Sequence, residues 1–192
     1  AFFLFGSAFI YGQAGSTTFD GIRNAIVESG GSDQFLLIGL ALLTVGLLFK
    51  VSAAPFHAWT PDVYQGSPTP VTAFMAAVTK VAAFGAAIRI YYFAVGGLVW
   101  SWRPILIAIS IATMAIGTVI AIAQKDVKRV LAYSAIAHSG FLLTGVIALS
   151  KDGLDATLLY LFTYGFATIG TFAIVTLVRD SGGEVSDLNR WA

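Results

Sequence analysis

Three side chains that can carry a proton stand inside strongly apolar stretches of this chain: Lys50, Lys80 and His138. A charged side chain deep in a bilayer costs at least ~2.5 to 3.5 kcal/mol, so it persists only where it faces protein or water. An amine or an imidazole held in such a place can take up and release a proton. The residue types and their positions therefore predict a polar, hydrated path for protons within a membrane.

Simpler interpretations of these residues stay open. Lys50 lies five residues before Pro55, so its ammonium could reach from a helix end to the headgroup region. Lys80 has apolar residues on both sides, which argues against that interpretation for it. His138 stands among serine and alanine residues and could be a packing residue that is hydrogen-bonded to a neighbour. Proton transfer and packing are both consistent with its surroundings.

The segment between the two lysines holds four of the five prolines. Proline removes a backbone donor and interrupts a helix, and hydrocarbon tolerates the freed carbonyls only where they face protein or water. Residues 53–69 are too apolar for a free loop and too rich in proline for one helix. We therefore predict a discontinuous helix, with Pro55 and Pro61 at the break. Carbonyls freed near Val51 should favour the ammonium form of Lys50, while burial opposes it.

Two further polar residues, His57 and Asp62, lie in the same proline-rich segment. His57 could support the predicted path or simply pack beside Trp59, and Asp62 could cap a helix or lie in a loop. Structural and catalytic zinc sites use three or four His, Cys or carboxylate ligands. The sequence has two histidines and no cysteine. We expect no metal, no iron–sulfur cluster and no catalytic nucleophile on this chain.

The composition is that of a membrane protein. Hydrophobic residues make up 57% of the chain and charged residues 11%, with a mean hydropathy of +0.83. A soluble domain carries roughly 25% charged residues. The net charge of +1 is too small to indicate a nucleic acid or an acidic substrate as partner. The bilayer, water and protons are the expected surroundings.

Apolar runs of about 20 residues predict the membrane-spanning helices. They lie at about 1–13, 34–52, 70–94, 104–123, 130–149 and 154–178, with 53–69 as the second half of the broken helix. A short surface helix is expected around 20–29, and 179–192 is expected to be a cytoplasmic loop. The fold class is an all-α polytopic membrane bundle, with one transmembrane domain over 1–192. Because the chain begins without Met and within an apolar run, we interpret it as an internal fragment.

Lysine and arginine at the helix ends predict the orientation of the bundle. One side collects five of them, and the positive-inside rule makes it cytoplasmic: Lys125, Lys128, Arg129, Arg179 and Arg190. Lys80 follows Pro70 by ten residues, and His138 follows Arg129 by nine. At ~1.5 Å per residue, both lie roughly 14 to 15 Å inside a core about 30 Å thick. The three titratable residues should therefore form an axis in the plane of the membrane, bridged by water.

Two motifs carry a resemblance to a known family. They read FKVSAAPFHAWTPDVYQGSPTPVTAFMAAVTK, which contains both lysines, and AIAQKDVKRVLAYSAIAHSGFLL, which contains His138. Together they resemble the antiporter-like, proton-translocating membrane subunits of respiratory NADH:quinone oxidoreductase (complex I), in particular the subunit N (ND2-like) branch. The resemblance runs from about residue 34 to the end of the chain.

This resemblance implies roles for the residues. Lys50 would lie on the discontinuous helix as the first channel lysine, Lys80 would be the central lysine, and His138 would belong to the same polar axis. The family also uses a glutamate on an earlier helix and a lysine on a later broken helix, and neither position lies in this sequence. NADH, FMN, iron–sulfur clusters and quinone would be bound by other subunits of the complex, which would also be the protein partners.

Three functions remain open at this point. The first is a proton-translocating subunit of NADH:quinone oxidoreductase in a bacterial plasma membrane. The second is a subunit of a multi-subunit sodium/proton antiporter, which shares the fold and also uses lysines within the membrane. The third is a transport-inactive helical scaffold. Lysines at the membrane midplane argue against a scaffold, and the stretch VYQGSPTPV together with the QKDVKR loop favours the complex I branch.

Overall fold

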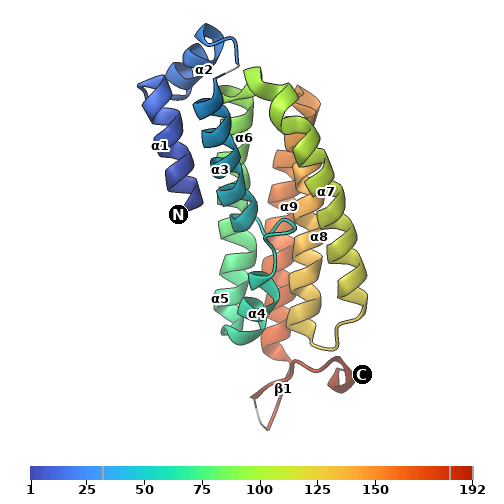
Figure 1. Cartoon of the computed structure of the whole chain (residues 1–192). Helices are drawn as coiled ribbons and strands as arrows, with labels where there is room; N and C mark the ends of the chain where they lie inside the picture. The colour runs from blue at the N-terminus through green and yellow to red at the C-terminus, as the bar shows by residue number, and fades with distance from the viewer. Residues whose placement is uncertain (32, 182, 192) are drawn as a thin grey trace.

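The computed structural model describes residues 1–31, 33–181 and 183–191. It is a long bundle of helices whose axes run alongside one another, with α1 and α2 at one flank and a polar turn at the lower end (Figure 1). The helices are α1 (Phe2–Ala14), α2 (Phe19–Glu28), α3 (Gln34–Lys50), α4 (Trp59–Gly66), α5 (Thr69–Phe74), α6 (Lys80–Arg89), α7 (Val99–Ile122), α8 (Val127–Ala148) and α9 (Lys151–Leu177). The expected all-α membrane bundle is confirmed.

Four continuous helical segments in the described part of the chain are long and apolar enough to cross a membrane. They are Thr69–Ala94, Gly96–Ile122, Val127–Ala148 and Lys151–Leu177. The apolar helices α1 and α3 are shorter, and α2 lies where a short surface helix was expected. Large apolar side chains are exposed along the outer faces of α1, α7 and α9. Such faces suit contact with lipid or with other protein.

Polar caps set the starts of the last two long helices. The Asp126 carboxylate accepts a hydrogen bond from the Arg129 amide, and Ser150 Oγ accepts one from the Gly153 amide. These side chains satisfy amides that have no partner within the helix. As a result α8 begins at Val127 and α9 at Lys151, three residues before the starts of 130 and 154 expected from the apolar runs.

Helix α7 also begins earlier than expected, at Val99 rather than at 104. A short 3₁₀ turn, Gly96–Leu98, leads into it. The indole of Trp102 is buried and donates a hydrogen bond of 3.1 Å to the Val95 carbonyl, which holds this turn against the helix. Pro104 therefore lies inside α7 instead of opening it.

The stretch expected as one helix over 70–94 is interrupted twice by π-helical turns. They span Met75–Thr79, directly before α6, and Ile90–Ala94, directly after it. A π turn widens the helix by one residue, and such turns often occur at functional sites. The first of them places Lys80 at the start of α6.

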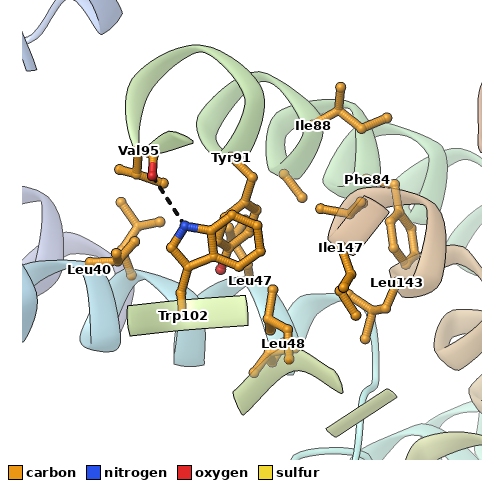
Figure 2. Close-up of a cluster of buried hydrophobic side chains, with 14 of the residues drawn as sticks. Leu40, Leu47, Leu48, Phe84, Ile88, Tyr91, Val95, Trp102, Leu143 and Ile147 are labelled. Carbon is orange, nitrogen blue, oxygen red and sulfur yellow. Dashed lines mark hydrogen bonds between the residues drawn. The ribbon is translucent and has the colours of Figure 1, made fainter. Parts of the chain in front are cut away.

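The main apolar core joins α3, α6, α7 and α8 (Figure 2). Tyr91 and Trp102 lie at its centre, with ring centroids 4.7 Å apart. The Tyr91 hydroxyl pairs with Thr44 Oγ1 at 2.7 Å, so the buried phenol keeps a polar partner. Leucines of α3 lie beside the two rings, and Phe84 of α6 and Leu143 of α8 extend the same cluster. This core fixes α6 and hence the position of Lys80.

A small polar structure closes the lower end of the bundle. The strands β1 (Arg179–Asp180) and β2 (Gly183–Glu184) pair antiparallel, and the 3₁₀ turn Leu188–Arg190 follows them. Glu184 forms an ion pair of 3.2 Å with the buried Lys128 of α8 and accepts a hydrogen bond from Thr69 Oγ1 at the start of α5. The region expected as a loop over 179–192 thus packs on the helix ends in its described residues.

Candidate functional site

Lys80 is buried, with 3% of its surface exposed. Its ammonium donates a hydrogen bond to the Ala135 carbonyl of α8 and lies 5.3 Å from the centroid of the Tyr164 ring of α9. The preceding π turn is internally bonded, because Thr79 Oγ1 donates to the Met75 carbonyl at 2.6 Å. Among the described residues, the five ion pairs found do not include Lys80. A carbonyl and an aromatic face are therefore its immediate partners.

His138 contacts the same tyrosine as Lys80. The centroids of the His138 and Tyr164 rings are 5.2 Å apart, and His138 Nδ1 is hydrogen-bonded to the hydroxyl of Tyr160. Three helices thus bring Lys80, Tyr164, His138 and Tyr160 into one contiguous group. We call these four residues the lysine–histidine group.

Close packing of α8 and α9 assembles this group. A Cβ atom at Gly145 would lie 3.0 Å from the Gly153 carbonyl oxygen and would collide with the Thr157 hydroxyl. The absence of a side chain at Gly145 therefore lets the two helices approach closely near their connection. From there α9 runs alongside α8, and its tyrosines reach the face of α8 that carries His138.

A groove of about 280 Å³ runs between α8 and α9 beside the lysine–histidine group. It is lined by His138, by apolar residues and by six side chains with hydroxyl groups: Ser134, Tyr160, Thr163, Tyr164, Thr168 and Thr171. A space of this kind can hold water, since it exceeds the roughly 10 to 15 Å³ that one water needs and offers several polar partners. The geometry suits transfer of protons between side chains and water.

Lys50 is not part of this group. It is the last residue of α3 and is exposed, and it lines a surface hollow with Phe49, Phe56 and the start of α1. Within the described residues its ammonium has no hydrogen bond or ion pair. The structure therefore places the two lysines in different environments and shows no direct contact between them.

The helix break after Lys50 is held by side chains of other elements. Ser139 Oγ donates to the Val51 carbonyl at 2.6 Å, and Trp59 Nε1 donates to the Phe49 carbonyl at 3.1 Å. Thr113 Oγ1 accepts a bond of 3.0 Å from the Ala54 amide. Carbonyls near Val51 were expected to be free to favour the Lys50 ammonium. Those of Phe49 and Val51 instead accept hydrogen bonds from Trp59 and Ser139.

The other residues of the proline-rich segment have separate positions. Pro55 lies in the break and follows a cis peptide bond, whereas Pro61 is buried in the first turn of α4, where a missing amide costs little. Pro61 therefore helps to begin a helix after the break.

His57 is half-buried, and its Nδ1 has no hydrogen-bond partner among the described residues. Asp62 is an exposed residue that pairs with Arg129 at 2.8 Å, away from the lysine–histidine group.

The sequence interpretation missed Tyr160 and Tyr164. A signal for the tyrosines was available, since hydroxyl-bearing residues recur along one face of α9 at 157, 160, 164, 168 and 171. Spacings of three and four place them on one face of a helix. Such a stripe in an apolar helix indicates a face that meets polar groups or water. In the described part of the chain, no group of three His, Asp or Glu residues could hold a metal ion.

Comparisons with known proteins agree on one family. The chain is 58% identical over 191 residues to the NADH-quinone oxidoreductase subunit N of Parafrankia sp., and 57% identical over 192 residues to that of Rhodococcus opacus. All of this chain is covered in both matches, but it spans only 36% of the length of either relative.

Solved structures with the same fold extend this result. A chain of respiratory complex I from Thermus thermophilus matches with a TM-score of 0.74 and 40% identity, over 90% of this chain and 36% of that one. A chain of the Mrp complex from Dietzia sp. matches with a TM-score of 0.85 and 24% identity, over 96% of this chain and 34% of that one, which shows the fold alone. The transmembrane family described as NADH:quinone oxidoreductase/Mrp antiporter matches residues 1–191, and the chain belongs to it.

Proposed function

We propose that this chain is the proton-conducting middle part of a subunit N of NADH:quinone oxidoreductase in a bacterial plasma membrane. Other subunits would oxidise NADH with FMN and iron–sulfur clusters and would reduce quinone. The observation that supports this proposal most is the burial of Lys80 against one carbonyl and one aromatic ring, without an ion pair among the described residues. The names and identities of its relatives favour complex I over a sodium/proton antiporter.

These surroundings suit a lysine that changes its protonation state. A buried carboxylate would hold the ammonium charged, because losing the proton would leave an unpaired negative charge. A carbonyl and a ring face stabilise the ammonium more weakly. The charged and neutral forms of Lys80 are therefore closer in free energy than those of a lysine in a buried ion pair. Proton transfer needs such a balance.

The proposed route passes from Lys50 through water to Lys80 and on to His138. Lys50 is exposed beside the helix break, and protein segments of the larger relatives would cover this face and supply its counter-ion. His138 joins the route through Tyr164, which contacts both His138 and Lys80, and His138 is also hydrogen-bonded to Tyr160. Pro55, Pro61, His57 and Asp62 support the route by shaping the break and its ends. The conformational step that drives protons one way is supplied by the rest of the complex.

The test is Lys80→Ala in the full-length subunit within the assembled complex. A methyl group cannot hold a proton, yet it suits a membrane helix better than an ammonium does. We expect proton pumping into membrane vesicles to fall at least about tenfold, as for loss of a general acid–base group. Lys125→Ala is the matched control, since Lys125 is an exposed lysine at the bundle end. Normal pumping in Lys80→Ala, with normal assembly on a native gel, would refute the proposal.

A further inference from the structure

The hydroxyl of Ser139 lies within hydrogen-bonding distance of two backbone carbonyls, one near each lysine. Ser139 is fully buried on α8, and its Oγ is 2.6 Å from the Val51 carbonyl oxygen and 3.0 Å from the Ala135 carbonyl oxygen. Val51 directly follows Lys50 at the helix break, and the Ala135 carbonyl accepts the hydrogen bond from the Lys80 ammonium. One hydroxyl therefore reaches both the break and the carbonyl that holds Lys80.

The Ser139 hydroxyl has a single proton, so the two carbonyls compete for it. The Ala135 carbonyl has two lone pairs, and it already accepts from the Lys80 ammonium and, as in any α-helix, from the amide four residues later. With Lys80 charged, the Val51 carbonyl is therefore the better acceptor, in agreement with its shorter distance. Rotation of the hydroxyl moves the proton to the other carbonyl and needs no movement of heavier atoms.

This preference changes when Lys80 loses its proton. A hydrogen bond from a charged donor is roughly twice as strong as one from a neutral donor, so a neutral amine holds the Ala135 carbonyl weakly. The Ser139 hydroxyl can then turn to Ala135, one turn earlier on its own helix. The Val51 carbonyl thereby loses the partner found for it in the described part of the chain. A free carbonyl at the C-terminal end of a helix attracts cations, and Lys50 is the adjacent residue.

We propose that Ser139 is a positioning residue whose hydroxyl transmits the charge of Lys80 to the helix break beside Lys50. With Lys80 charged, Ser139 binds the Val51 carbonyl and holds the break against α8. With Lys80 neutral, Ser139 releases that carbonyl, which then favours an ammonium at Lys50. Charge is thereby favoured on one lysine at a time. The use of this link in proton transfer rests on the proposed function, whereas the link itself can be measured without pumping.

Amide hydrogen exchange at the break measures the link in the full-length subunit of the assembled complex. The reporters are the amides of Ser52, Ala53 and Ala54, whose hydrogen bonds are 2.9 to 3.2 Å long and join this turn to α3 and α7. These amides directly follow Val51 in the chain. They should therefore exchange faster when the Val51 carbonyl is no longer held by α8.

Three variants isolate the Ser139 hydroxyl. Lys80→Met removes the charge and the donors and keeps an unbranched side chain. Ser139→Ala removes only the hydroxyl. Ser110→Ala is the matched control, because Ser110 is also buried and also donates to a carbonyl of another helix, that of Gly140 at 2.8 Å.

We expect Ser139→Ala to speed exchange at the three amides about threefold or more, as for the loss of one buried hydrogen bond. Lys80→Met should speed exchange to a similar extent when Ser139 is present and should add nothing in the Ser139→Ala background. In the Ser110→Ala background, the effect of Lys80→Met should persist in full. Unchanged exchange in Lys80→Met would overturn the proposal. Effects of Lys80→Met and Ser139→Ala that multiply, as they do at independent sites, would also overturn it.

Pumping by these variants separates the link from the proposed function. Ser139→Ala should lower proton pumping several-fold relative to quinone reduction, while Ser110→Ala should keep it within about twofold of normal. Normal pumping in Ser139→Ala would overturn the part of Ser139 in proton transfer. Independent exchange effects together with lost pumping in Lys80→Ala would refute the link and leave the proposed function standing. Non-additive exchange effects together with normal pumping in Lys80→Ala would refute the function and leave the link in place.

Discussion

Lys50 and Lys80 interrupt apolar helices in a similar way, but their surroundings differ. Lys80 is buried at a π turn and contacts a carbonyl of α8 and a ring of α9. Lys50 is exposed at the end of α3, where the chain breaks. The difference shows that a lysine in an apolar run can mark either an interior site or a surface that another protein segment covers. Hydropathy alone does not separate the two.

A third lysine sharpens this comparison. Lys128 is buried almost as fully as Lys80, at 7% and 3% exposed. Lys128 pairs with Glu184 at 3.2 Å and donates to the Ser67 carbonyl at 3.3 Å. Burial with a carboxylate indicates a structural cation, whereas burial of Lys80 with a carbonyl and a ring suits a group that changes charge. The variants below test this distinction.

The largest effect is expected for Lys80→Arg compared with Lys50→Arg. Arginine keeps the positive charge but effectively never releases a proton, and its guanidinium is larger than an ammonium. In the enclosed site of Lys80 both properties are harmful, so pumping should fall by about tenfold or more. Lys50 is exposed on α3, so the added size should disturb packing less there, and lost proton release should be the main cause of reduced coupled turnover.

Pumping and quinone reduction would be measured on vesicles with matched subunit levels. Full rates in Lys50→Arg would show that Lys50 only needs to be positive, and its role as a proton carrier would be withdrawn. Normal rates of pumping and quinone reduction in Lys80→Arg would show that Lys80 does not need to release a proton, and the proposed difference between the two lysines would be withdrawn.

An intermediate effect is expected at Tyr164, whose ring contacts both the Lys80 ammonium and the His138 imidazole. A cation over an aromatic face gains about 0.5 to 2 kcal/mol. Tyr164→Leu removes the ring and should slow pumping several-fold, whereas Tyr164→Phe keeps the ring and should retain most of it. The pH profile of pumping should shift in Tyr164→Leu, because the ammonium of Lys80 loses a stabilising contact. Equal rates in the two variants would show that the ring does not position Lys80.

The sequence allowed much of this architecture to be predicted, because length and apolarity decide which segments cross a bilayer. The prolines between the lysines predicted a break, and the structure has one after Lys50. Helix starts were less predictable, since Asp126 and Ser150 begin α8 and α9 outside the apolar runs.

Contacts between segments that lie far apart in the chain could not be predicted from the sequence. The π turn before Lys80 lies where α5 and α6 pack against α9, and composition does not reveal it. The hydroxyl spacing on α9 indicates a polar face, but it does not tell which helix that face meets. Tyr164 could therefore be assigned to Lys80 only after the fold was known. The engagement of the Val51 carbonyl by Ser139 likewise joins residues 88 positions apart.

The smallest effect on pumping is expected at the Lys128–Glu184 pair, which serves as the structural reference for Lys80. The hydrogen bond from Thr69 and the nearby Lys128 ammonium lower the pKa of Glu184 from its ordinary value of 4.5. A carboxyl whose pKa is lowered in the folded state adds stability, and this stability is fully present when the pH is above the ordinary pKa of the carboxyl. That stability is lost as the pH falls from 4.5 through the lower pKa that Glu184 has in the folded state. Docking of the terminal hairpin should therefore be independent of pH at neutrality and weaken in acid.

Amide hydrogen exchange at Val127 and Val185 measures this docking, because these amides bond to the Ser186 and Val178 carbonyls at 2.8 and 3.1 Å. Glu184→Gln should lower the exchange protection of both amides at neutral pH, and this protection should no longer depend on acid. Pumping should stay within about twofold of normal, because the ion pair lies away from the lysine–histidine group. Unchanged protection would show that the ion pair does not hold the hairpin. A loss of pumping as deep as in Lys80→Ala would place Lys128 in the proton path. Lys128 and Lys80 would then be two buried lysines of one kind, and pairing with a carboxylate would no longer distinguish a structural lysine from a proton carrier.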